Sequence, residues 1–168
     1  MTEEKLILVD ELDNEIGVCE KIEAHQKKLL HRAFSIFVFN DKKELLLQRR
    51  AVTKYHSAGL WTNTCCGHPR PNETTINAAT RRLQEEMGFV CSLQRSFSFI
   101  YDAKLENNLF EYEYDHVFIG TYNDAPVINT EEASEWKYES LELVKQDVLR
   151  YPQNYTVWFK KCLDRIVI

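Results

Sequence analysis

Residues 67–89 read GHPRPNETTINAATRRLQEEMGF and carry the most regular helical pattern of the chain. Polar residues at 72–75 can cap a helix, and Gly88 can end it. An apolar stripe with intervals of three and four residues runs between these ends and consists of Ile76, Ala79, Leu83 and Met87. We therefore predict a helix that packs this stripe against a core. Alone, the charged residues Arg82 and Glu86, one turn apart and off the stripe, indicate only an intrahelical ion pair of about 0.2–0.5 kcal/mol.

The overlapping stretch WTNTCCGHP, residues 61–69, places a thiol and an imidazole two positions apart, at Cys66 and His68. A cysteine can exchange a proton or act as a nucleophile, and a histidine can bind a metal at neutral pH. A single cysteine is more often a small buried hydrophobe. The pair is a candidate site. Whether it has a chemical role depends on which other residues lie close to it in the fold.

The amino-terminal part is predicted to begin with two strands, at residues 6–9 and 16–19, joined by a polar turn. The segment EAHQKKLLH that follows has helical character and contains His25 and His31. A spacing of six does not place both on one helical face, so they converge only if the chain turns between them.

Residues 33–39 and 44–48 are predicted to form a hairpin. Its second strand runs into a basic group, Arg49, Arg50 and Lys54. Such a group at a strand end is usually a solvated rim. Its position shortly before Cys66 makes it a candidate for holding an anion.

After the helix, strands are predicted at residues 96–101 and 109–122, with a connecting loop at 102–108. Alternation in the second strand places Glu111 and Glu113 on one face, where they either bind one cation together or form a solvated polar face.

The last predicted elements are a strand at 136–138 and helices at 141–149 and 154–166. Strands with irregularly interleaved helices favour an α+β fold, or a layered α/β/α domain with a mixed sheet. With 168 residues, the simplest organisation is one domain over residues 1–168.

Composition narrows the classes of function. The net charge of −5 argues against a nucleic-acid surface, and no apolar run reaches the length of a membrane span. The five cysteines, an odd number that includes an adjacent pair, favour a reducing compartment, and the acidic amino terminus does not resemble a targeting peptide. We expect a cytoplasmic monomer without a nucleic-acid, membrane or obligate protein partner.

From Gly67 onward the chain resembles the Nudix box, G-x5-E-x7-R-E-U-x-E-E-x-G-U with U a bulky aliphatic residue. Every specified spacing matches, with Glu73 and Arg81 at their expected places. Arg82 departs from the pattern, because the family has a metal-binding glutamate there, and Phe89 is aromatic at the last position. The resemblance implies a Nudix-like α/β/α fold. The guanidinium at position 82 puts hydrolysis in doubt but not diphosphate binding.

Together with WTNTCCGHP, the altered box resembles the type I isopentenyl diphosphate isomerases, a branch of the Nudix fold. Further segments carry the same resemblance: EKIEAH, LLHRAF, QRRAVTK, EYE and the tryptophan-bearing carboxy-terminal helix. The resemblance implies an enzyme that converts isopentenyl diphosphate to dimethylallyl diphosphate by adding a proton at one carbon and removing another from a nearby carbon.

The resemblance also implies a role for particular residues. A divalent cation would be held by His25, His31, His68, Glu111 and Glu113. The acid–base groups would be Cys66 on one face of the substrate and Glu113, assisted by Tyr101, on the other. The carbocation would face Trp158, with Trp61 as a second candidate. The diphosphate would be bound by Lys21, Arg50, Lys54 and Arg82, with a Mg²⁺ ion that joins it to Glu86.

Imidazole with carboxylate ligands suits zinc, manganese or iron(II) more than calcium. We expect manganese, zinc or magnesium at the histidine site. Two alternatives stay open: a Nudix pyrophosphohydrolase acting on a nucleotide-type diphosphate, and a non-catalytic domain with a structural zinc held by cysteine and histidine.

Overall fold

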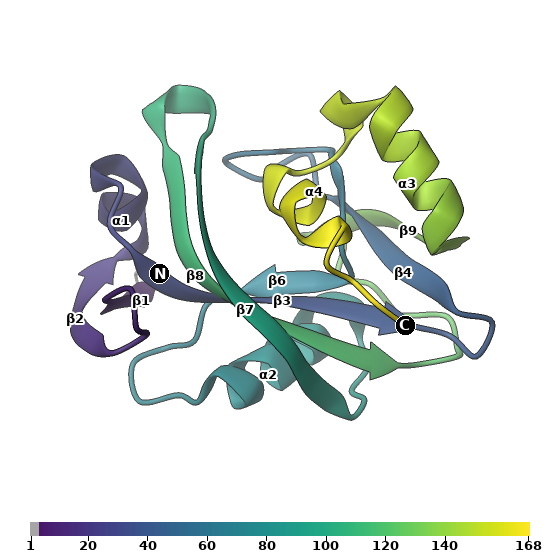
Figure 1. The fold of residues 1–168 in the computed structure, drawn as a ribbon, viewed down its shortest axis with the longest axis horizontal. Coiled ribbons are helices and arrows are strands. Elements are labelled where there is room, and N and C mark those ends of the chain that lie inside the picture. Colours follow the sequence, from purple (N-terminus) through teal and green to yellow (C-terminus); the bar gives the residue numbers. More distant parts are fainter. Residues whose placement is uncertain (1–3) are drawn as a thin grey trace.

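Strand β3 (His31–Phe39) is the centre of a mixed sheet in the computed structural model, which describes residues 4–168 (Figure 1). It runs parallel to β8 (Phe110–Thr121) along its whole length and antiparallel to β6 (Cys65–Gly67) at its middle. The other strands of the nine-stranded sheet are β1 (Lys5–Val9), β2 (Glu15–Glu20), β4 (Glu44–Arg50), β5 (Trp61–Thr62), β7 (Leu93–Lys104) and β9 (Ala133–Ser140). The predicted α+β class with a mixed sheet is confirmed.

Helices cover both faces of this sheet, which gives the α/β/α layers (Figure 1). The four helices are α1 (Lys21–Lys27), α2 (Thr75–Met87), α3 (Leu141–Arg150) and α4 (Val157–Leu163). Alternate residues of β3 and β4 point to opposite sides. One side packs Phe37 and Leu47 with α4, and the other packs Ile36 and Leu46 with α2. Among residues 4–168, each helix is too short or too polar to span a bilayer.

Helix α2 begins and ends where its sequence predicts. The Thr74 hydroxyl accepts a hydrogen bond from the backbone N–H of Asn77, and Gly88 ends the helix with φ of 75°. A Cβ atom at Gly88 would lie 2.3 Å from the carbonyl oxygen of Val127, so only glycine fits there. The predicted stripe is wrong at Ile76, which is 38% exposed in the first turn; Ala78 is buried in its place.

Two predicted boundaries are also wrong. Strand β7 continues to Lys104, so residues 102–104 pair with β8 and do not belong to the loop. The last helix spans only Val157–Leu163 because the chain before it is extended: Tyr155 bridges to Trp61, and the backbone N–H of Thr156 donates to the carbonyl of Trp61. This long-range pairing overrides the local helical pattern.

The turn that His25 and His31 require is present. Helix α1 ends at Lys28, which adopts a left-handed conformation with φ of 52°, and the backbone N–H of Leu29 donates to the carbonyl of Ala24. The chain then enters β3 at His31, so the two imidazole rings lie with their centroids 5.1 Å apart.

Candidate active site

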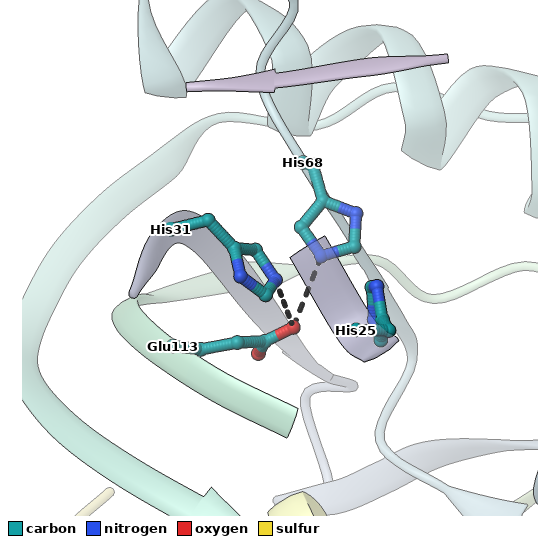
Figure 2. Close-up of side chains that lie close together, drawn as sticks. All are labelled: His25, His31, His68 and Glu113. Carbon is teal, nitrogen blue, oxygen red and sulfur yellow. Dashed lines mark hydrogen bonds and ion pairs between the residues drawn. The ribbon is translucent and has the colours of Figure 1, made fainter. Parts of the chain in front are cut away.

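Three histidines and a glutamate from four segments of the chain point toward one another (Figure 2). His25 lies on α1, His31 begins β3, His68 follows β6 and Glu113 lies on β8 in register with His31. The Oε1 atom of Glu113 lies 3.0 Å from Nε2 of His68 and 3.5 Å from Nε2 of His31. One ligand atom from each of the four residues lies within 4.8 Å of the others, as a cation site requires.

The unused hydrogen-bonding capacity of this cluster fits a divalent cation. Backbone carbonyls lie 2.7 Å from Nδ1 of His25 and 2.8 Å from Nδ1 of His31, and each accepts that N–H. The Nε2 atoms of these two rings therefore carry a lone pair, are buried, and have no hydrogen-bond partner among residues 4–168. A backbone carbonyl on the far nitrogen is the usual orientation of a metal-binding histidine.

Glu111 lies at the edge of this cluster and not among its four central residues. Its Oε2 atom lies 3.3 Å from Nε2 of His25, and it forms a second close group with His25 and His56. Burial and the neighbouring Glu113 raise the pKa of Glu111, whereas the adjacent imidazoles of His31 and His68 outweigh burial and hold the pKa of Glu113 well below its usual range.

A cavity of about 690 Å³ opens beside the cluster and is lined by all four residues expected to carry the reaction: Cys66, Tyr101, Glu113 and Trp158. The phenol of Tyr101 donates to Oε2 of Glu113 at 2.7 Å, since the two residues pair in register across β7 and β8. Burial raises the pKa of the Cys66 thiol to about 12, so it keeps its proton at neutral pH. Its neighbour Cys65 points to the opposite side and is fully buried against α2.

Trp158 forms one wall of the cavity from helix α4 and is 4% exposed. The guanidinium carbon of Arg50 lies 5.2 Å from the centre of its ring, and the edge-on ring of His56 lies 5.9 Å away. The second candidate, Trp61, does not line the cavity and lies under Lys137.

The four cations expected to bind a diphosphate, Lys21, Arg50, Lys54 and Arg82, all line the same cavity. Three of them are paired with glutamates: Lys21 with Glu4 at 2.7 Å, and Lys54 and Arg82 both with Glu132.

Arg82 also pairs with Glu86, as its helical spacing predicts. Glu86 is 6% exposed, lines the cavity and accepts a hydrogen bond from Gln48 at 2.9 Å. Arg82 therefore lines the cavity and forms the intrahelical ion pair with Glu86 at the same time.

The residues that sequence reasoning missed are His56, Glu132 and Glu4. None of the three has a spacing signal, and each reaches the cavity only through tertiary placement. Burial, together with the nearby Arg50, lowers the pKa of His56 to about 3. Neither close group within residues 4–168 contains a cysteine, which argues against a structural zinc held by Cys66 and His68.

This fold, with a histidine–glutamate cluster beside a basic cavity, defines a NUDIX domain, and the model of that family matches residues 29–159. Solved structures agree on the fold: a Deinococcus radiodurans protein has a TM-score of 0.79 at 18% identity, covering 96% of this chain and 98% of that one. The MutT protein of Methanosarcina mazei Go1 has a TM-score of 0.67 at 20% identity, covering 81% and 91%.

Relatives in sequence narrow the class. Isopentenyl-diphosphate Delta-isomerase 2 of Photorhabdus laumondii is 58% identical over 162 residues, 96% of this chain and 92% of that protein. Isopentenyl-diphosphate Delta-isomerase 2 of Aromatoleum aromaticum is 52% identical over 165 residues, 98% of this chain and 87% of that protein. The chain belongs to the family of isopentenyl-diphosphate Delta-isomerases.

Proposed function

We propose that the chain converts isopentenyl diphosphate to dimethylallyl diphosphate, with Cys66 and Glu113 as its two acid–base groups. One observation carries this proposal: a thiol, an indole and four cations all line one cavity, together with His68 and Glu113 of the histidine–glutamate cluster. A hydrolase would not require a buried thiol and an indole there, and Arg82 replaces a carboxylate of the hydrolase pattern.

The reaction moves a double bond by one position. A proton is added to the terminal carbon of the alkene, positive charge develops on the tertiary carbon, and a proton leaves the carbon on its other side. Cys66 and Glu113 supply and accept these protons from opposite faces, and they exchange roles between the forward and reverse directions. Tyr101 holds Glu113 through its 2.7 Å hydrogen bond and so fixes the carboxyl group toward the cavity.

Trp158 stabilises the developing positive charge without capturing it, because an indole face attracts a cation but forms no bond with it. This attraction amounts to about 0.5–2 kcal/mol, the larger values where water is excluded. The low exposure of Trp158 favours the upper part of that range.

A divalent cation would be held by His25, His31, His68 and Glu113, with Glu111 beside them, and manganese, zinc or magnesium suits this donor set. When bound, the cation shifts the proton affinity of the Glu113 carboxyl group. The chain's own contribution is to fix the imidazole rings of His25 and His31 through the carbonyls of Lys21 and Leu29.

We further propose that Lys21, Arg50, Lys54 and Arg82 bind the diphosphate, with Mg²⁺ between it and Glu86. The substrate would then displace Glu4 and Glu132 from the cations with which they pair.

We also propose that residues 1–168 act as one catalytic domain. The five free cysteines support a cytoplasmic location.

The test is product analysis with the purified protein, isopentenyl diphosphate and Mg²⁺ with Mn²⁺ in deuterated water. We expect an allylic product that carries deuterium. Cys66→Ala and Glu113→Gln should lose both conversion and deuterium exchange, whereas Cys65→Ala, the adjacent control, should retain them. Absence of product while an authentic isomerase converts the same sample would refute the proposal, and phosphate release from a nucleoside diphosphate derivative would support the hydrolase instead.

A further inference from the structure

His56 is a buried residue of the loop between β4 and β5 that the reaction proposed above does not use. It is 6% exposed, and its ring lies between the histidine–glutamate cluster and the cavity wall. Its Nε2 atom lies 3.5 Å from Oε1 of Glu111, and its ring stands edge-on to Trp158 with centroids 5.9 Å apart. It is therefore the side chain that joins these two parts of the site.

We propose that His56 is a positioning residue of the cation centre. Its Nε2 atom faces the outer carboxylate oxygen of Glu111, Oε1, at 3.5 Å, and donation from this nitrogen would keep the inner oxygen, Oε2, beside His25. This inference rests on the proposed cation centre and adds a residue outside the five ligands expected for it.

The contacts of the ring favour this orientation. The Oγ atom of Ser57 lies 3.3 Å from Nδ1 of His56 and can donate to it, which leaves the proton of a neutral ring on Nε2. With a cation in the centre, Glu111 would be ionised and would only accept hydrogen bonds, so the nitrogen that faces it would be the one that donates.

Two hydrogen bonds hold the backbone at His56 and its neighbour Ser57. The guanidinium of Arg50 donates to the backbone carbonyl of His56 at 3.1 Å, and the backbone N–H of Ser57 donates to the Glu106 carboxylate at 3.1 Å. Because Arg50 also lies over Trp158, the imidazole is fixed relative to both the cavity wall and the cluster.

His56 lies outside the four-residue centre, which favours a contact with Glu111 over a direct role as a ligand of that centre. His56 does not belong to the group of four, whose atoms all lie within 4.8 Å of one another, and it meets the centre at Glu111 and His25. Glu111 contacts two members of that group, His25 and Glu113.

The experiment measures cation binding directly. Metal-free wild type, His56→Ala and His56→Gln are titrated with Co²⁺, and binding and ligand geometry are followed by the visible absorption bands of the ion. We expect His56→Ala to raise the Kd for Co²⁺ about 10- to 100-fold, the usual effect of removing a partner of a ligand. His56→Gln should recover most of this loss, because its amide N–H can donate from a similar position. The bands should keep their positions in all three proteins, since no ligand atom changes.

Two control variants distinguish a failure of the role of His56 from a failure of the cation centre. Val52→Ala lies in the same loop at a residue that is 77% exposed, and it should bind Co²⁺ as the wild type does. His68→Ala removes an expected ligand and should abolish tight binding; if it binds normally, or if the wild type binds no Co²⁺, the cation centre itself fails.

Three results with an intact centre would overturn the positioning role. They are an unchanged Kd in His56→Ala, a band shift in His56→Ala that His56→Gln does not reverse, and a second Co²⁺ per chain that His56→Ala removes. The second result would make His56 a ligand, and the third would make it part of a separate site.

Discussion

Replacing Arg82 with alanine should weaken both substrate binding and the fold. The guanidinium lines the cavity and pairs with three carboxylates: Glu86, Glu85 at 2.8 Å and Glu132 at 3.2 Å. After the substitution, buried Glu86 keeps only its hydrogen bond from Gln48. A diphosphate in the cavity would lose one of its four proposed cations.

The expected loss of stability depends on how far these charged groups are exposed to solvent. Removing one partner of a buried ion pair costs about 3–5 kcal/mol, and exposed pairs contribute about 0–1 kcal/mol. The Arg82 side chain keeps 22% of its exposure, so we expect an intermediate loss of about 1–3 kcal/mol. The melting temperature of a chain of this size should fall by roughly 2–12 °C. A lost hydrogen bond between charged groups, about 1.5–3 kcal/mol, should raise KM for isopentenyl diphosphate about 10- to 150-fold.

Steady-state kinetics and thermal unfolding measure the two effects separately. We expect kcat to change less than KM, because Arg82 would contact the diphosphate and not the reacting carbons. Arg49→Ala is the matched control: Arg49 forms an ion pair with Glu135 at 2.7 Å but does not line the cavity. If Arg82→Ala lowers the melting temperature but leaves KM unchanged, Arg82 is only an ion-pair partner and the diphosphate assignment is refuted.

Three further predictions concern the core, the cluster and a buried acid. Leu83→Ala should lower the free energy of unfolding by about 2–5 kcal/mol in urea titrations, whereas Ile76→Ala, at the exposed start of α2, should lower it by less than about 1 kcal/mol. Adding Mn²⁺ at about 100 times its Kd should stabilise the metal-free protein by about 2.7 kcal/mol in thermal unfolding, and His68→Ala should remove this gain; equal melting temperatures with and without Mn²⁺ would contradict a cation centre. Burial raises the pKa of Asp115 to about 8, above its unfolded value, so its ionisation opposes folding increasingly as the pH rises from about 4 to 8. The stability of Asp115→Asn relative to the wild type, measured at pH 5 and pH 8, should therefore increase with pH, and a constant or falling difference would contradict the raised pKa.

Local sequence signals predicted those parts of the fold that local chemistry decides. Thr74 and Gly88 bound α2 because capping and the left-handed conformation depend on nearby backbone groups alone. The carboxy-terminal helix is shorter than its pattern because Tyr155 and Thr156 pair with Trp61, almost a hundred residues earlier. Spacing along the chain contains no information about such pairing.

The residues of the candidate site also fall into those that the sequence predicted and those that it did not. The residues tied to a recognisable motif, such as Cys66, His68 and Glu113, all line one cavity. His56 and Glu132 lie outside any motif, and their positions follow from how two loops close over the sheet. Alternation along the strand predicts that Glu111 shares a face with Glu113. It does not predict that Glu111 lies at the edge of the cluster.

Close packing at Gly67 joins the strand that carries the thiol to helix α2. A Cβ atom there would lie 3.0 Å from the Phe34 ring and 3.4 Å from Cγ of Arg82, so a larger residue would push β6 away from both β3 and α2. Strand β6 carries Cys66 and α2 carries Arg82, and both residues line the cavity. The arginine therefore adds positive charge close to the strand of the thiol, where the Nudix pattern would have a carboxylate. An arginine in place of a carboxylate favours the binding of an anionic substrate and disfavours the activation of water for hydrolysis. An isomerase must bind its diphosphate substrate without hydrolysing it.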